Sequence, residues 1–263
     1  MLLDGAAAGP WNMGVDEALL ASAVECGRPT LRLYRWKGPW LSLGYGQRLG
    51  VERLAACDAA GVGVVRRATG GKAVLHGGDL TYAVAAPEEV LPPGLRATYE
   101  LVGVALRNAL VALGIDARTT PGASPAPRPG SFDCFCEPAG DELCVEGRKL
   151  VGSAQRRARG GVLQHGSIRV SPDPAPVHAA AGLAAGVATS LRELTFEHSP
   201  ETLAEACVAA FSRVLGLPFE PGSLEAGEEK IARERVFAHR LDPVAVPHFA
   251  PRGPQGRISV TDT

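Results

Sequence analysis

The chain has 263 residues, 46% of them hydrophobic, and a formal net charge of −1. This length suffices to bury the core of one large domain or two smaller ones. The near-neutral charge gives no global electrostatic reason to bind nucleic acid or membrane, and no apolar run approaches the ~20 residues of a membrane-spanning helix. Asp4 interrupts the apolar N-terminus, which lacks the basic start of a signal peptide. We therefore expect a soluble, cytoplasmic protein that binds neither nucleic acid nor membrane.

In the first half of the chain, capping residues and apolar periodicity delimit the helices. Asn12 is the expected N-cap of a helix that runs to about Glu25, and Asp16 and Glu17 suit the positive N-terminal end of that helix. The clearest helix is expected over residues 97–113, where apolar residues recur on one face. The other elements expected here are a short helix at 51–60 and strands at 31–36, 41–45, 62–66, 73–76 and 80–86.

The second half begins with residues 121–130, whose four prolines and two glycines predict a surface loop. Ser199 is the expected N-cap of another helix, with Pro200 at its first position. The remaining elements are strands at 143–145, 149–155 and 161–170 and a helix at 225–240. Strands and helices mix without strict alternation, which predicts an α+β fold with a mixed, mostly antiparallel sheet packed with helices. We expect one domain over residues 1–242 and a Pro/Gly-rich tail over 243–263.

The most informative run places Cys134 fifteen residues before Lys149. The thiolate form of cysteine is the nucleophile, and an ordinary thiol with a pKa of ~8.5 is only slightly ionised at neutral pH. A cation close by favours the thiolate, and Lys149 is the candidate for that cation. Taken alone, Lys149 fits a solvated lysine at the end of a strand better, so the pairing depends on the motifs around it.

The other cysteines leave alternatives open. Cys136 is a rival nucleophile, two residues from Cys134. Together with Cys144 these residues would supply three zinc ligands, but a zinc site needs a fourth ligand. Zinc-binding cysteines also usually have two or four residues between them, whereas only one separates Cys134 from Cys136, so we expect no metal. Cys144 and Cys207 lie among apolar residues and are expected in the core. The six cysteines show no disulfide-scaffold spacing, which is typical of a reduced protein.

A second informative stretch spans residues 66–76 around the glycine pair Gly70 and Gly71. Two glycines in a tight turn let backbone N–H groups approach a ligand, and Arg67 beside the turn suits an anionic group. The stretch is not a Walker A loop, because Ala73 follows the lysine where Ser or Thr is required. Without further context, a glycine hairpin flanked by surface arginines explains it equally well.

Five segments occur in an order shared with a known family. They are Asn-Met-x-x-Asp-Glu-Ala-Leu-Leu at 12–20, Arg-Arg-x-Thr-Gly-Gly-x-Ala-Val-x-His at 66–76, Gly-Arg-Lys-x-x-Gly-Ser-Ala-Gln at 147–155, Gln-His-Gly-Ser at 164–167 and Gly-Val-Ala-Thr-Ser-Leu at 186–191. In these segments the chain resembles the lipoate–protein ligase and octanoyltransferase family, which is related to biotin–protein ligases. The resemblance covers roughly residues 12–240 and implies a catalytic domain of the biotin/lipoate ligase type within 1–242.

Two departures from the ligases favour acyl transfer. Lipoate ligases usually carry a third glycine where this chain has Lys72. They also carry an Asn-Asp pair, associated with the adenylate, where this chain has Gly-Asp-Glu-Leu-Cys at residues 140–144. Cys134 followed by Phe135 resembles instead the cysteine-dependent octanoyltransferases, as does the basic residue at 72. The resemblance therefore implies an octanoyltransferase of lipoate biosynthesis. Its donor would be octanoyl-acyl carrier protein, and its acceptor the lipoyl-domain lysine of the glycine-cleavage H protein or a 2-oxoacid dehydrogenase E2.

The resemblance also implies site residues. Cys134 would form a thioester acyl-enzyme, and Lys149, or a water it holds, would help deprotonate the acceptor lysine. The apolar acyl slot is expected to be lined by strand residues near Val74 and His76. The substrate-binding residues would be Arg67, Gly70, Gly71, His76, Gly152 and Ser153, the glycine turns supplying candidate oxyanion donors. His76 and His165 equally fit structural histidines.

Rival functions remain on this scaffold. An ATP-dependent lipoate–protein ligase would need ATP and Mg, whereas the transferase needs no cofactor. An amidotransferase between two lipoyl proteins would use the same thiol chemistry with another donor, and a non-catalytic binding module or a zinc-stabilised interaction protein would use none of it. A basic face that could dock acidic carrier or lipoyl domains would consist of Arg66, Arg67, Lys72, Arg148, Arg156, Arg157 and Arg159.

Overall fold

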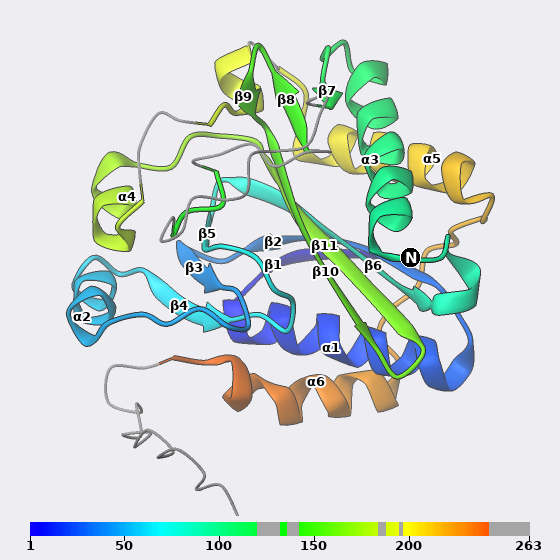
Figure 1. Cartoon of the computed structure of the whole chain (residues 1–263), viewed down its shortest axis with the longest axis horizontal. Helices are drawn as coiled ribbons and strands as arrows, with labels where there is room; N and C mark the ends of the chain where they lie inside the picture. Colours follow the sequence, from blue (N-terminus) through cyan, green and yellow to red (C-terminus); the bar gives the residue numbers. More distant parts are fainter. Residues whose placement is uncertain (120–131, 136–141, 184–187, 195–196, 242–263) are drawn as a thin grey trace, which may run out of the picture.

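The computed structural model describes residues 1–119, 132–135, 142–183, 188–194 and 197–241. Its centre is a five-stranded sheet (Figure 1). In spatial order the strands are β1 (Leu2–Ala7), β2 (Thr30–Trp36), β6 (Asp79–Pro87), β11 (Gly161–Arg169) and β10 (Val151–Ala158). A second sheet contains β4 (Gly63–Arg66), β3 (Trp40–Leu43) and β5 (Val74–His76), and a third contains β7 (Arg118–Thr119), β8 (Leu143–Val145) and β9 (Arg148–Lys149).

Only β1–β2 and β3–β4 pair in parallel among the described strands, so the predicted mixed, mostly antiparallel α+β fold is confirmed. Helices cover both faces of the central sheet, with α1 and α6 on one face and α3 and α5 on the other (Figure 1). The helices are α1 (Gly9–Cys26), α2 (Val51–Ala59), α3 (Leu95–Ala112), α4 (Ala175–Ala181), α5 (Pro200–Leu215) and α6 (Ala226–His239). Two 3-10 turns, Glu88–Val90 and Leu191–Leu194, complete the described elements.

The alternation of side chains along β6 explains how one sheet serves two cores. Tyr82 and Val84 pack with α3 and α5, whereas Ala83 and Ala85 pack with α1. Successive side chains of a strand point to opposite faces, and helices cover both faces here. Every residue of β6 is therefore buried, which accounts for its apolar run over residues 83–87.

The helix ends show where capping arguments succeed. Ser199 caps α5, because its Oγ accepts a hydrogen bond from the N–H of Thr202 at 3.2 Å, with Pro200 in the first turn. This predicted cap is confirmed. Glu225 and Glu228 form a capping box at the start of α6, close to the predicted start of that helix.

The predicted cap of α1 is wrong. The helix begins at Gly9, with Ala8 as N-cap and Pro10 in its first turn, so Asn12 lies inside it. The side-chain amide of Asn12 instead donates a hydrogen bond to the Arg35 carbonyl on strand β2 at 3.1 Å. The first turn holds no acidic residue, so Asp16 and Glu17 do not interact with the positive end of this helix.

Other boundaries also differ from the sequence pattern. The strand expected at 41–45 ends at Leu43, and the strand expected at 149–155 is divided between β9 and β10. Strand β1 and helix α4 were not predicted. The proline-rich stretch at 121–130 and the tail at 243–263 lie outside the described residues, so both stay predictions.

A buried ionic network joins α1 to the sheet. Arg32 on β2 is fully buried and donates to the carboxylates of Asp16 at 2.8 Å and Asp4 at 2.6 Å. Asp16 also accepts from the Tyr34 hydroxyl at 2.9 Å and contacts His165 Nδ1 at 2.8 Å. Burial alone would raise the pKa of Asp16, but His165 and Arg32 outweigh burial, and the pKa is lowered. The helix is thus held by a carboxylate that stays ionised.

This network predicts the effect of Asp16→Ala. Removing Asp16 leaves the buried Arg32 with only the partly exposed Asp4 as a counter-charge and deprives Tyr34 and His165 of their partner. We therefore expect a loss of about 3–5 kcal/mol in the free energy of unfolding, measured by urea denaturation at pH 7. Glu201→Ala is the control, since its pair with Arg35 is exposed, and it should cost less than about 1 kcal/mol. Equal losses for the two variants would contradict the prediction.

The same carboxylate sets a pH dependence. The folded-state pKa of Asp16 lies below its ordinary value of 3.8, so its contribution is present above that value and is lost as the pH falls through the folded pKa. The stability difference between the wild type and Asp16→Ala should therefore shrink in urea titrations below pH 3.8.

Candidate active site

The two motifs singled out in the sequence lie against one another. The N–H of Ala73, at the end of the glycine turn, donates to the Phe132 carbonyl, and the Cys134 N–H donates back to the Ala73 carbonyl, both at 2.9 Å. An Asx-type bond from the Phe135 N–H to Asp133 Oδ1 at 2.8 Å tightens the loop. The cysteine loop is thus fixed to the edge of β5 by backbone hydrogen bonds.

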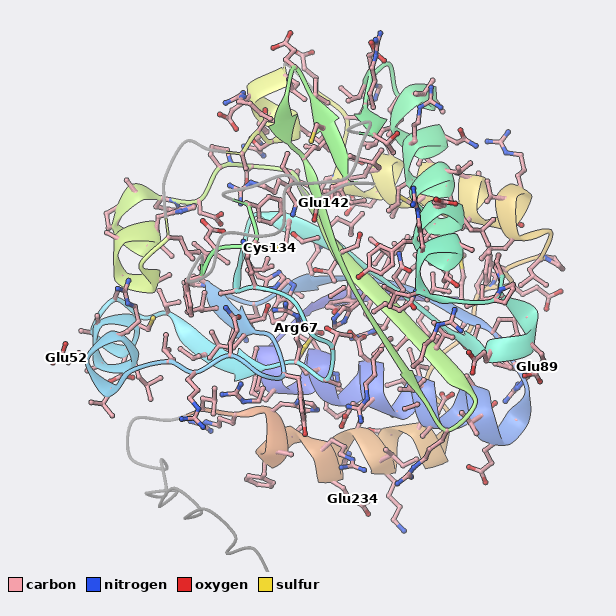
Figure 2. All side chains as sticks on the ribbon, in the orientation of Figure 1. Glu52, Arg67, Glu89, Cys134, Glu142 and Glu234 are labelled. Atoms are coloured by element: carbon pink, nitrogen blue, oxygen red, sulfur yellow. The ribbon has the colours of Figure 1, made fainter. Side chains whose placement is uncertain are left out.

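Lys149 and Cys134, the predicted catalytic pair, are in contact. The Lys149 ammonium lies 3.3 Å from Cys134 Sγ, 2.8 Å from the Cys134 carbonyl oxygen and 2.5 Å from Glu142 Oε1. Figure 2 shows Cys134 and Glu142 in the same region of the fold. Lys149 is buried, which alone would lower its pKa, but the negative charges of Cys134 and Glu142 outweigh burial and raise it. The lysine therefore carries its charge at neutral pH.

Gly152 on β10 provides the space for this contact. A Cβ added there would lie 3.3 Å from Lys149 Cε and from Phe135 Cζ, and 3.5 Å from Cys134 Sγ. These separations are at or below ordinary van der Waals contact. A side chain at this position would press on both members of the pair.

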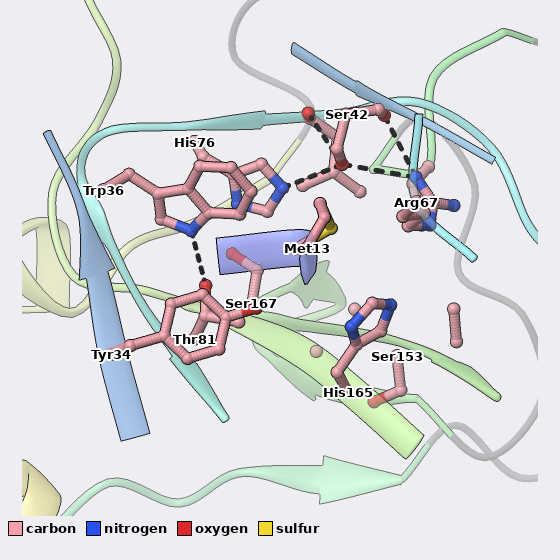
Figure 3. A pocket seen from close by; sticks show the side chains of 15 residues that line it. Met13, Tyr34, Trp36, Ser42, Arg67, His76, Thr81, Ser153, His165 and Ser167 are labelled. Carbon is pink, nitrogen blue, oxygen red and sulfur yellow. Dashed lines mark hydrogen bonds between the residues drawn. The ribbon is translucent and has the colours of Figure 1, made fainter. Parts of the chain in front are cut away.

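A pocket extends from Cys134 towards β2 (Figure 3). It includes Val74 and His76, where the acyl slot is expected. Four of the six predicted substrate-binding residues line it, namely Arg67, His76, Gly152 and Ser153. Its other lining residues are Met13, Tyr34, Trp36, Ser42, Thr81, Ala154, His165, Gly166 and Ser167. The cavity measures about 30 Å³, which is room for one or two waters.

Both pocket histidines are held at both ring nitrogens. His76 contacts Asp79 at 2.8 Å and Ser42 Oγ at 2.9 Å, and its ring stacks on Trp36 with centroids 3.9 Å apart. His165 contacts Thr69 Oγ1 at 2.7 Å through Nε2 and Asp16 on α1 at 2.8 Å through Nδ1. The geometry therefore fits the structural alternative for both histidines.

Arg67 is buried, not on a surface. Its guanidinium donates to the carbonyls of Gly70 and Lys72, both at 2.7 Å, and of Ser42 at 3.0 Å. These bonds fix the glycine turn from inside. Gly70 and Gly71 lie in this turn and not among the pocket-lining residues, and the Gly71 carbonyl would be 2.0 Å from a Cβ at Gly44, so the two loops pack backbone to backbone.

The predicted basic face is only partly present. Arg67 is removed from it by burial, and several of the other arginines pair with carboxylates. These ion pairs are Arg148 with Glu193, Arg156 with Glu17 and Arg157 with Glu88. Pairing halves the net positive charge that such a face would offer to an acidic partner.

Two residues near the site were missed by sequence reasoning. Tyr82 contacts Ser153 Oγ at 2.7 Å, and burial raises the pKa of Tyr82 to about 12, which keeps its hydroxyl protonated. Glu142 was noted only as a departure from the ligase pattern. The register of the strands would have indicated Glu142, because Glu142 directly precedes β8, the strand that pairs with Lys149 on β9.

The remaining predictions concern metals, membranes and the other cysteines. In the described ranges no group of three or more His, Cys, Asp or Glu could hold a metal ion. Of the helices in that part of the chain, none is long and apolar enough to cross a membrane. Cys144 and Cys207 are buried as predicted, and burial raises the pKa of Cys207 to about 12. Cys136 lies outside the described residues, so its rival roles stay untested.

Fold and site together define a catalytic domain of the biotin and lipoate ligase class, and comparison with known proteins agrees. The chain matches the lipoyl protein ligase A/B catalytic domain over residues 9–212 and belongs to that family. It is 38% identical to octanoyltransferase LipM of Kyrpidia tusciae over 92% of this chain and 96% of the relative. LipM of Symbiobacterium thermophilum is 39% identical over 90% and 94% of the two chains. The prediction of an acyltransferase enzyme is therefore confirmed.

Solved structures share the fold. Protein Ta0514 of T. acidophilum with bound lipoic acid superposes with a TM-score of 0.74 at 25% identity, covering 89% of this chain and 92% of that one. Lipoate-protein ligase A bound with ATP gives a TM-score of 0.75 at 23% identity, covering 90% and 93%. The predicted ligase-like architecture is confirmed by both.

The space at Gly152 yields a test of the site. In Gly152→Ala the new methyl group would displace the lysine or the thiol, so we expect acyl transfer to fall at least ~10-fold, as misplacement of reacting groups by a fraction of an ångström does. Steady-state kinetics would measure this, with a thermal melt to confirm folding. The matched control is Gly5→Ala on strand β1, whose added Cβ meets no atom within 4 Å. Full activity in Gly152→Ala would contradict the prediction.

Proposed function

We propose that this enzyme moves an octanoyl group from octanoyl-acyl carrier protein to the lipoyl-domain lysine of an acceptor protein, by way of a thioester on Cys134. The observation that carries the proposal is the buried Lys149 ammonium 3.3 Å from Cys134 Sγ. A fixed cation at this distance stabilises a thiolate by charge attraction. The relatives named octanoyltransferase support the choice of acyl group.

The chemistry divides into two steps. The Cys134 thiolate attacks the thioester carbonyl, a carbon–sulfur bond to the enzyme forms, and the carrier thiolate leaves and takes a proton. The neutral amine of the acceptor then attacks the acyl-enzyme, an amide forms, and the Cys134 thiolate leaves beside Lys149. A thioester is already activated, so the sequence needs neither ATP nor another cofactor. Backbone N–H groups of Gly152 and Ser153, with those of the Gly70–Gly71 turn, would stabilise the oxyanion.

The pocket is the proposed acyl slot. Its lining includes Val74, Met13 and Trp36 together with Cys134, so an acyl chain on the thiol would have these apolar side chains to contact. At about 30 Å³ the cavity is smaller than an eight-carbon chain, which therefore enters by moving lining side chains. Met13 is suited to this, because methionine is unbranched and adapts its rotamers easily.

The nearest alternative is an ATP-dependent lipoate–protein ligase, whose fold this chain shares. In a ligase the lysine would face an anionic adenylate. Here the Glu142 carboxylate accepts a hydrogen bond from the Lys149 ammonium at 2.5 Å, and its negative charge would repel a phosphate. An amidotransferase between lipoyl proteins, the second alternative, differs only in its donor. The acceptor of either transferase would be a glycine-cleavage H protein or a 2-oxoacid dehydrogenase E2.

Intact mass spectrometry tests the proposal. Incubation with octanoyl-acyl carrier protein and no ATP should add one octanoyl group, which hydroxylamine should release. Cys134→Ala should form no adduct because it lacks the nucleophile, whereas Cys144→Ala should still acylate, since Cys144 is buried in strand β8.

Three outcomes would overturn parts of this scheme. Lipoylation that strictly requires ATP, with no adduct, would favour the ligase. An adduct that persists in Cys134→Ala and disappears in Cys136→Ala would move the nucleophile. Acylation by octanoyl–H protein and not by the carrier protein would favour the amidotransferase.

A further inference from the structure

The Lys149 ammonium has three N–H groups, and three acceptors surround it. They are the thiol and the carbonyl oxygen of Cys134 and the carboxylate of Glu142. An ammonium carries no lone pair, so a lysine held this way cannot take a proton from an attacking amine. The geometry therefore conflicts with the expectation that Lys149 deprotonates the acceptor.

Strand register explains why Glu142 reaches Lys149. Cys144 on β8 pairs directly with Lys149 on β9, so the side chains of these two residues lie on one face of the hairpin. Glu142 lies two residues before Cys144 and therefore shares that face as the diagonal neighbour of Lys149. The hairpin turn is tight, with Glu146 and Gly147 at φ 50° and 75°, which fixes the register.

Burial makes this carboxylate effective. The Lys149 side chain is 1% exposed and that of Glu142 is 12% exposed, so water screens their interaction little. A buried ammonium without a counter-charge is costly, and Glu142 is a counter-charge that no step of the proposed reaction consumes.

We propose that Glu142 is a positioning residue that keeps Lys149 protonated and aimed at Cys134, so that Lys149 acts as a fixed cation and not as a general base. This inference rests on the proposed function and deepens it. The acceptor ammonium then gives two of its three protons to water, one before attack and one from the tetrahedral intermediate, and the third stays on the amide nitrogen. The carrier thiolate takes one proton from water, so the whole reaction releases one proton.

Other titratable groups face this cluster and are common to all variants compared. They are Cys144 on β8, Tyr82 on β6, Tyr99 on α3, Arg67 after β4 and Arg169 on β11. Burial raises the pKa of Tyr82, Tyr99 and Cys144, which keeps these groups neutral at neutral pH. Burial lowers the pKa of Arg67 to about 10. Because Arg67 is present in every variant, the difference in the Lys149 midpoint between variants reports the effect of Glu142 alone.

Carbon-13 NMR of the lysine side chains tests the proposal directly. The chain has only four lysines, Lys37, Lys72, Lys149 and Lys230, so Lys149→Arg assigns the Lys149 Cε signal. In the wild type this signal should titrate above the ordinary lysine value of 10.5, since the pKa is raised. In Glu142→Gln the midpoint should fall by about 1–3 pH units, as expected when an opposite charge is removed at this distance. The readout needs no acyl donor, so it distinguishes failure of this inference from failure of the proposed function.

Glu193→Gln is the matched control, because Glu193 contacts Arg148, the neighbour of Lys149 on the same strand, at 3.4 Å. It should leave the Lys149 titration unchanged. In single-turnover acylation, Glu142→Gln should be at least ~10-fold slower than the wild type at pH 7.5, with partial rescue by Glu142→Asp.

An unchanged Lys149 midpoint in Glu142→Gln would overturn the inference, and so would an equal shift in Glu193→Gln. If Glu142→Gln does not fold, Glu142→Asp provides the same spectroscopic test. Its carboxylate is one methylene shorter, so a smaller downward shift is expected, and no shift in a folded Glu142→Asp would overturn the inference.

Discussion

The Lys149 side chain is the group on which the site depends, because three segments of the fold meet at it. The cysteine loop, the β8–β9 hairpin and the start of β10 meet within hydrogen-bond or van der Waals distance of this one side chain. Each segment is fixed elsewhere by backbone bonds, the loop to β5 through Ala73 and the hairpin by its tight turn. The lysine thus adds charge to a geometry that the backbone has already set, which limits the entropy lost in holding it.

The sheet behind the pocket is polar where an apolar core would be expected, and the polarity is fully paired at its carboxylates. Asp79 accepts from Thr81 and Ser167 and contacts His76, while Asp16 binds Arg32, Tyr34 and His165 in the same way. Partly satisfied buried networks are costly, but complete ones make a core rigid and unique. Both carboxylates have lowered pKa values, so they stay ionised and the pocket walls hold their form at neutral pH.

The sequence predicted the parts of this site that local motifs encode. The pair Cys134 and Lys149 follows from the family resemblance of the motifs around it. The strand-rich α+β class and the Ser199 cap follow from periodicity and short-range chemistry. It misplaced what long-range partners decide: Asn12 caps nothing because its amide bonds the next strand, and Arg67 is buried because three carbonyls bind its guanidinium. The position of Glu142 beside Lys149 could not be predicted from the turn residues alone. It follows from the pairing of β8 with β9, which only the structure shows.

Charge conservation through the proposed cycle gives a reason for a carboxylate beside a catalytic lysine. With the thiolate free, Lys149 faces two negative charges. Once Cys134 carries an acyl group its charge is gone, and without Glu142 the ammonium would be buried alone, a situation that costs several kcal/mol. With Glu142 at 2.5 Å the cation keeps a partner in both states, so acylation removes one attraction without stranding a charge. A lysine and a cysteine alone would make the acyl-enzyme the unstable member of the cycle, and the third residue corrects this.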